Sequence, residues 1–149
     1  MGHIWKSILL GGLGSILALY LVHRLSNWFL RKSNGSWGFT DLSDIAALPL
    51  IILMINLMLF ITSPVINAYS RSIETEADRF ELELTKNNFS TATATVKMHQ
   101  QSLAMPEPGY VYMLWNYDHP TFKSRVDFAN EYRPWEEGKP LKYQKYIKK

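Results

Sequence analysis

The sequence IAALPLIILMINLMLFITSPVINAYS occupies residues 45–70 and contains no charged side chain. A transmembrane helix needs about 20 consecutive, mostly apolar residues, so this stretch is long enough to cross a bilayer. Pro49 and Pro64 lie near its two ends, where a kink is best tolerated, and Asn56 places a polar amide in the middle. An amide at that depth favours a protein partner over lipid. We therefore predict a transmembrane helix over residues 45–69 that packs against other helices.

A second uncharged run lies upstream, at residues 7–22, between Lys6 and Arg24. Trp5 and the basic flanks can extend it to the length of a span, because Lys and Arg side chains reach the membrane surface from within. A basic start followed by an apolar segment is also the layout of a signal peptide, but no clear small-residue cleavage site follows this run. We therefore expect a retained transmembrane helix over residues 4–24.

The rest of the chain reads as a linker and a water-exposed helical lobe. Residues 25–44 form the linker between the two predicted spans and contain turn-forming residues. Beyond it, helical spacing of apolar side chains and a helix-opening proline predict three helices. These helices cover residues 70–85, 90–105 and 120–130.

Two further segments are predicted to lack regular structure. Residues 110–116 are aromatic and irregular in pattern, directly after the helix-stopping sequence Pro-Glu-Pro-Gly. Residues 135–149 form an open, basic tail whose last nine residues contain four lysines and no acidic residue. Such a tail is either a solvated end or a segment attracted to anionic lipid.

Composition excludes several classes of function. The chain has 149 residues, a net charge of +3 and no cysteine. The absence of cysteine excludes disulfides, cysteine-based zinc fingers and thiol nucleophiles. The charge is too small to favour nucleic acid as a partner. The lipid bilayer is the partner that the two apolar runs predict.

Glu74 and Asp78 are the first residues that could carry chemistry. They lie four residues apart, so they share one face of the helix that follows the second span. Two carboxylates on one face can serve a metal ion or general acid–base chemistry. The alternative is a solvated acidic turn, in which Arg71 pairs with Glu74 and Arg79 lies beside Asp78.

His119 is the second candidate. It stands directly before the predicted start of a helix, where an imidazole could donate a hydrogen bond to an oxyanion, and Arg125 follows one to two turns later. The alternative is a surface histidine that caps a loop.

Both candidates match patterns of one protein family. The sequence NAYSRSIETEADRF, residues 67–80, resembles the third-ligand helix of the CAAX prenyl protease type I family. These are integral-membrane zinc metallopeptidases, with the HtpX heat-shock protease as a relative. The family pattern is Ser-Arg, then Glu-x-x-Ala-Asp-x-Phe, directly after a membrane span. The sequence YDHPT, residues 117–121, with Arg125 resembles the second family signature, His-Pro-Ser/Thr with an arginine six residues after the histidine.

The resemblance assigns roles to four residues. It implies that Glu74 is a zinc ligand and that Asp78 holds the N–H of a zinc-bound histidine. It implies that His119 stabilises the oxyanion and that Arg125 positions that site. The implied fold is an all-α membrane protein with two transmembrane helices and a C-terminal helical lobe of gluzincin type, residues 70–134. Peptides or proteins are the implied substrates, with one Zn²⁺ per complete active site.

The family's remaining ligands and its catalytic base come from a His-Glu-x-x-His motif, and these 149 residues do not contain that motif. Residues 1–6 resemble the segment that follows it. We therefore expect the C-terminal portion of a longer metalloendopeptidase, inactive as this chain alone, with the missing N-terminal half as a possible partner. The alternatives are a non-catalytic interaction or regulatory protein derived from the family, and a two-span protein of unrelated function. The resemblance is to bacterial members, which implies the inner (cytoplasmic) membrane and a role in protein quality control.

Overall fold

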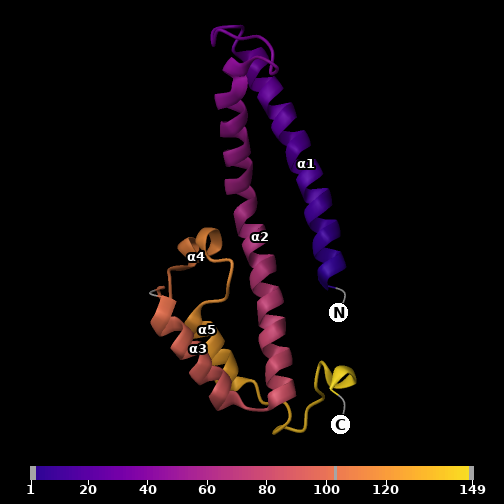
Figure 1. Ribbon diagram of the computed structural model, residues 1–149, viewed down its shortest axis with the longest axis vertical. Helices are drawn as coiled ribbons and strands as arrows, with labels where there is room; N and C mark the ends of the chain where they lie inside the picture. Colours follow the sequence, from indigo (N-terminus) through magenta and orange to yellow (C-terminus); the bar gives the residue numbers. More distant parts are fainter. Residues whose placement is uncertain (1–2, 103, 148–149) are drawn as a thin grey trace. The chain divides into compact units, whose positions relative to one another are not determined.

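The computed structural model describes residues 3–102 and 104–147, which form helices, turns and loops without a β-strand. The prediction of an all-α protein is therefore confirmed. The chain divides into two compact units between Thr62 and Ser63. In chain order the elements are α1 (His3–Lys32), η1 (Ile45–Ala47), α2 (Leu48–Thr85), α3 (Asn88–Ser102), α4 (Tyr110–Asn116), α5 (Phe122–Glu131) and η2 (Gln144–Tyr146) (Figure 1).

The N-terminal unit consists of α1 and the first part of α2, which run antiparallel and are joined by the linker (Figure 1). Two helices, Trp5–Lys32 and Ile45–Thr85, are long and apolar enough to cross a membrane. Most of their large apolar side chains are exposed, among them Leu13, Ile16, Leu53 and Phe60. Long uncharged stretches of helix with exposed apolar side chains have the composition that lipid contact requires.

Burial in this unit is concentrated near the linker. The linker is shaped by an N-cap, in which the Asp44 carboxylate accepts a hydrogen bond from the Ala46 N–H at 2.9 Å. The buried cluster contains Val22, Leu30, Phe39, Ala47, Leu50 and Met54. The core of the N-terminal unit therefore holds the linker end of the two helices together and leaves their lengths uncovered.

Both long helices extend beyond the predicted ends of their spans. α1 continues to Lys32 because the first backbone break comes only at Asn34 and Gly35, where φ is 47° and 76°. The predicted span over residues 45–69 and the predicted helix over residues 70–85 form one helix, α2. No glycine separates the two segments, and α2 ends before Lys86, whose φ is 51°.

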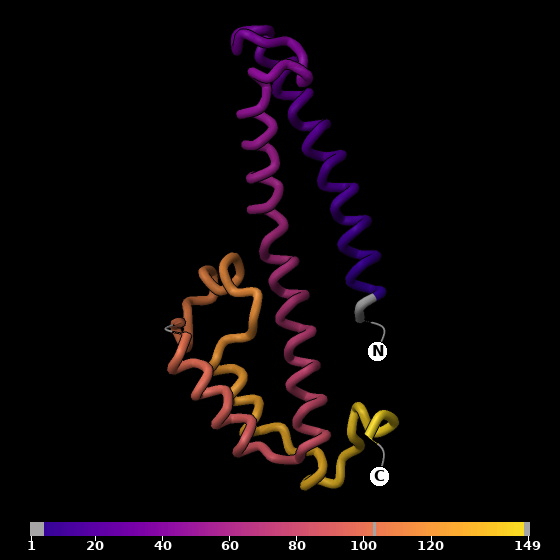
Figure 2. The backbone as a smooth tube through the Cα atoms, viewed as in Figure 1, coloured from indigo at the N-terminus to yellow at the C-terminus, as the bar shows by residue number. Residues whose placement is uncertain are grey.

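The C-terminal unit is built from the second part of α2, α3, α4 and α5, with α3 and α5 packed side by side (Figure 2). Leu82 of α2 and Ala129 of α5 are fully buried. The Asn88 amide donates hydrogen bonds to the backbone carbonyls of Ala129 and Tyr132, which ties the start of α3 to the end of α5. The helices predicted after residue 85 are therefore confirmed as α3 and α5, although residue 103 lies outside the described residues.

The prediction that residues 110–116 are irregular is wrong, because they form α4. Tertiary contacts complete this short helix. The Asn67 amide donates to the carbonyls of Leu114 at 3.2 Å and Trp115 at 2.9 Å. These are carbonyls of the last helical turn, which lack partners within a helix. The aromatic residues of α4 do not themselves indicate that a side chain of α2 will bond to the end of this helix.

The C-terminal segment packs on α2, where the sequence predicted an open tail. Glu83 of α2 is fully buried and accepts hydrogen bonds from the backbone N–H groups of Lys142 at 2.9 Å and Tyr143 at 2.7 Å. The Tyr132 hydroxyl donates a third at 2.6 Å, and burial together with this bond raises the pKa of Tyr132 to about 12. Three donors thus satisfy one buried carboxylate. Residues 148–149 of the predicted tail lie outside the described residues.

We expect Leu82→Ala to lower the free energy of unfolding by about 3 kcal/mol, because it removes a fully buried side chain from the C-terminal unit. Leu84→Ala is the matched control, since Leu84 lies on the same helix but is 55% exposed. Chemical denaturation of the full chain in detergent micelles measures both changes. Equal effects of the two substitutions would contradict the packing described for α2.

Candidate active site

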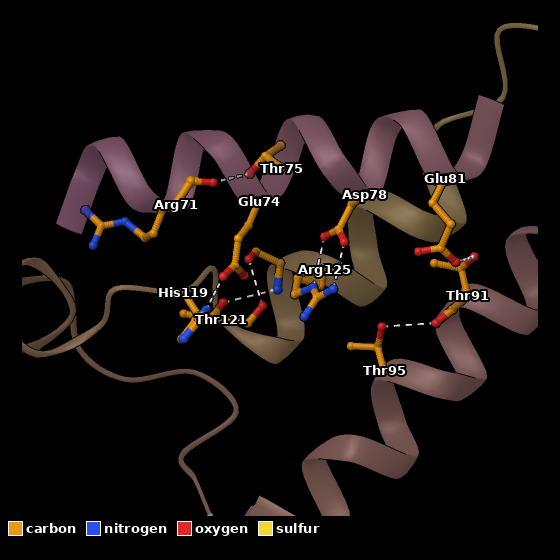
Figure 3. Close-up of polar contacts among 11 residues, drawn as sticks. Arg71, Glu74, Thr75, Asp78, Glu81, Thr91, Thr95, His119, Thr121 and Arg125 are labelled. Atoms are coloured by element: carbon orange, nitrogen blue, oxygen red, sulfur yellow. Dashed lines mark hydrogen bonds and ion pairs between the residues drawn. The ribbon is translucent and has the colours of Figure 1, made fainter. Parts of the chain in front are cut away.

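One face of α2 carries the predicted carboxylates, and the loop before α5 and the start of α5 lie against it (Figure 3). Glu74 and Asp78 are one turn apart on α2. His119 from the loop lies beside Glu74, and Arg125 from α5 lies beside Asp78. The structure therefore brings together the four residues that the sequence singled out, from segments more than 40 residues apart.

Glu74 and His119 form the more accessible half of this cluster. The His119 Nδ1 atom contacts the Glu74 carboxylate. The Glu74 side chain is 29% exposed and the His119 side chain 64%. The other ring nitrogen, Nε2, lies 3.6 Å from a carboxylate oxygen of Asp118. A carboxylate oxygen and an imidazole nitrogen are thus adjacent and reachable from solvent.

Asp78 and Arg125 form the buried half. The guanidinium donates two hydrogen bonds, from Nε to one carboxylate oxygen at 2.9 Å and from Nη2 to the other at 2.7 Å. This bond raises the pKa of Arg125, against the opposing effect of burial. Asp78 is only 7% exposed. A bidentate pair of this kind fixes both the distance and the orientation of the two groups.

The loop that carries His119 is held at both ends. The Arg71 guanidinium donates to the backbone carbonyl of Tyr117. At the other end, the buried Thr121 hydroxyl accepts a hydrogen bond from the Ser124 N–H at 3.1 Å and caps α5. Thr121 belongs to the His-Pro-Ser/Thr signature, but its capping role was not predicted, although threonine directly before a helical segment is a common N-cap signal.

The sequence left open a solvated acidic turn in which Arg71 pairs with Glu74. The structure shows other pairs. Arg79 contacts Glu76. Glu76 also accepts hydrogen bonds from the Lys142 ammonium at 2.6 Å and from the Tyr143 hydroxyl. Burial raises the pKa of Glu76, but these two hydrogen bonds and the charges of Arg79 and Lys142 outweigh it and lower the pKa to about 2. Glu76 is outside the uncharged part of α2, which ends at Ser70.

The five carboxylates of α2 differ in what holds them. Those of Glu76 and Asp78 are held by cations, that of Glu81 by the Thr91 hydroxyl at 2.9 Å, and that of Glu83 by three donors. The Glu74 carboxylate contacts an exposed imidazole. Glu74 is therefore a partly exposed carboxylate of α2 whose partner is itself mostly exposed.

The donor types at Glu74 and His119 suit zinc, but they are too few for a zinc site. Zinc in proteins takes three or four ligands from carboxylate oxygens, imidazole nitrogens and thiolates. Within residues 3–102 and 104–147, no group of three or more His, Asp or Glu side chains could hold a metal ion. The described residues thus offer part of a donor set.

Comparison with known proteins matches this chain to peptidases. The family model described as peptidase family M48 matches residues 1–133. An uncharacterized metalloprotease of Bacillus subtilis (strain 168), YhfN, is 27% identical over 136 residues, which cover 88% of this chain and 32% of that protein. The chain thus spans about a third of the length of the curated relative that it matches. No solved structure matches the chain.

We expect Asp78→Ala to destabilise the chain by about 3 kcal/mol, because it leaves a largely buried guanidinium without its counter-charge. A double-mutant cycle with Arg125→Ala should give a coupling energy of about 2 kcal/mol. The control is the cycle for Lys123 and Asp127, an exposed pair on the same helix that should show no measurable coupling. Denaturation in detergent measures both cycles. Similar coupling in the two cycles would contradict the role given to the buried pair.

The lowered pKa of Glu76 predicts a dependence of stability on pH. The ordinary value is 4.5 and the folded value is about 2, so the carboxylate stabilises the fold above pH 4.5. That contribution is lost as the pH falls from about 4.5 to about 2. We expect the thermal unfolding midpoint in detergent to fall in this window, and to fall less in Glu76→Gln. Glu136→Gln, which alters an exposed carboxylate, should keep the slope of the unaltered chain. An unchanged slope in Glu76→Gln would refute the prediction.

Proposed function

The chain belongs to peptidase family M48, and we propose that it carries one metal ligand and the substrate-stabilising residues of a zinc-dependent, membrane-embedded metalloendopeptidase. Within the family we place it with the CAAX prenyl protease type I and HtpX-like group, on the two signatures that contain Glu74 and His119. The observation that carries the proposal is the cluster itself. A partly exposed carboxylate on α2 contacts His119 and stands one turn from a buried aspartate–arginine pair.

Glu74 is the proposed metal ligand. Its carboxylate is partly exposed, and its partner is an exposed imidazole, so a metal ion could take the place of that partner. When bound, zinc in such a site would polarise the scissile carbonyl and ease the loss of a proton from the water that attacks it. The family's His-Glu-x-x-His motif is absent from these 149 residues, so the other ligands and the base would come from residues outside them.

Asp78 is the proposed orienting residue. Arg125 donates one hydrogen bond to each carboxylate oxygen, and each oxygen keeps further lone-pair capacity. Asp78 can therefore accept an N–H from a metal-binding histidine while Arg125 keeps the carboxylate in place. Such a hydrogen bond sets the tautomer and the direction of the imidazole ring.

His119 is the proposed donor to the oxyanion that forms when the peptide carbonyl is attacked. Its Nδ1 faces Glu74, and Nε2 of the mostly exposed ring lies 3.6 Å from the Asp118 carboxylate. The capped start of α5 and the Arg71 contact hold the backbone on either side of this histidine. A donor that is positioned before the reaction stabilises developing charge without reorganisation.

In our proposal, α1 and residues 45–69 of α2 cross the bacterial inner membrane. The length and apolar composition of the two helices support this. Peptides or proteins are the substrates that an M48 peptidase implies. We propose quality control of membrane proteins as the role. The second candidate is a non-catalytic interaction protein derived from the family, which the incomplete donor set of the described residues favours.

We expect Glu74→Gln to abolish zinc binding and to lower cleavage by at least about 100-fold, since it removes a metal ligand. The test is made with the chain joined to a segment that carries His-Glu-x-x-His. Zinc content is measured by mass spectrometry and cleavage with an unfolded protein substrate. Glu136→Gln, an exposed carboxylate, is the control and should keep both.

Full zinc content and full cleavage in Glu74→Gln would overturn the ligand assignment. Neither zinc binding nor cleavage in the unaltered joined chain would favour the non-catalytic candidate instead.

A further inference from the structure

The short helix α4 exposes an uncharged, aromatic face. Tyr110 is 70% exposed, Val111 69% and Tyr112 50%. All seven residues of α4, YVYMLWN, are uncharged, and the nearest charged residues in the sequence are Glu107 and Asp118. In a protein surrounded by water, such a face is unfavourable unless something covers it.

Hydrogen bonds fix the level of α4 along α2. Asn67 donates to the carbonyls of Leu114 and Trp115, and Arg71 donates to those of Met113 and Tyr117. In α2, Asn67 belongs to the uncharged stretch, and Arg71 is the first charged residue after it. Figure 1 shows α4 at the end of this unit where its part of α2 begins. α4 therefore lies at the level where the uncharged part of α2 ends.

The chemistry at this level is that of a membrane–water interface. α2 exposes Val65 and Ile66 there, with 72% and 58% of their surfaces accessible. Tyrosine and tryptophan are enriched where the headgroups meet the acyl chains, because their rings are apolar and their polar groups can reach water. Side chains of α2 satisfy carbonyls at the end of α4, and backbone groups close to hydrocarbon need such protein partners.

We propose that α4 is an interfacial anchor whose exposed face, Tyr110, Val111 and Tyr112, contacts the lipid bilayer at the boundary of headgroups and acyl chains. This inference rests on the proposed span over residues 45–69. A lipid surface is favoured over a protein partner because α4 is bonded to α2 where the uncharged stretch ends. His119 follows α4 by three residues, so the anchor would fix the height of the histidine loop above the membrane.

The absence of cysteine allows a direct test with single cysteines that carry a nitroxide label. Tyr112→Cys and Val111→Cys probe α4, Lys97→Cys on the exposed side of α3 is the control in water, and Leu57→Cys is the reference within the proposed span. The full chain is placed in vesicles of phosphatidylcholine with a minor fraction of phosphatidylglycerol. Collision of each label with oxygen and with a water-soluble nickel chelate reports its depth.

We expect the Tyr112 and Val111 labels to collide severalfold less often with the nickel chelate than the Lys97 label, and more often with oxygen. If both α4 labels match the Lys97 label while the Leu57 label is protected, α4 faces water or a protein partner and the inference is wrong. If the Leu57 label is also open to the chelate, the proposed span itself fails, and the inference fails with it.

Discussion

The buried ion pair between Asp78 and Arg125 is the interaction on which the candidate site depends. Taking two charges out of water is costly unless each finds a well-aligned partner, and here the two carboxylate oxygens meet two guanidinium nitrogens. The pair fixes the first turn of α5 against α2. The position of that turn restricts where the residues just before it can lie. His119 is thereby brought to Glu74, one turn along α2 from the pair. The loop itself contacts α2 through the Arg71 bond to the Tyr117 carbonyl and through the pairing of His119 with Glu74.

A second constraint comes from the length of α2. In lipid, each backbone polar group must be satisfied within the protein, and a continuous helix is the simplest way to do so. The same helix continues past Ser70, where charged residues begin, and ends at Thr85. Helical periodicity therefore sets the spacing of Arg71, Glu74 and Asp78 on one face. The element with the composition of a membrane span thus also presents the site residues in register.

The sequence predicted this fold where the signal was local. Residues 45–70 are uncharged over a length that water-soluble helices seldom reach, and the spacing of Glu74 and Asp78 put them on one face. Local patterns did not predict contacts between distant segments, and only the family resemblance grouped the residues of the candidate site. Nothing local linked Asp78 to Arg125 or Asn67 to the carbonyls of α4, so α4 was expected to be irregular. The packing of the C-terminal segment on Glu83 could not be predicted for the same reason. The donors are backbone N–H groups, which every residue except proline has, so the sequence does not distinguish them.

The way in which the carboxylates of α2 are held separates structural from functional roles. A structural carboxylate is most useful when its partners are numerous and buried, as those of Glu83 are, because opening the contact then costs much free energy. A metal ligand has the opposite requirement, since it must give up its partner in the free protein when the ion binds. Glu74 meets that requirement, with a partly exposed carboxylate and a histidine that is mostly in solvent. In our proposal, the incomplete donor set of the described residues and the exposed partner of Glu74 have one explanation. Glu74 is held ready for an ion whose other ligands would come from residues outside these 149.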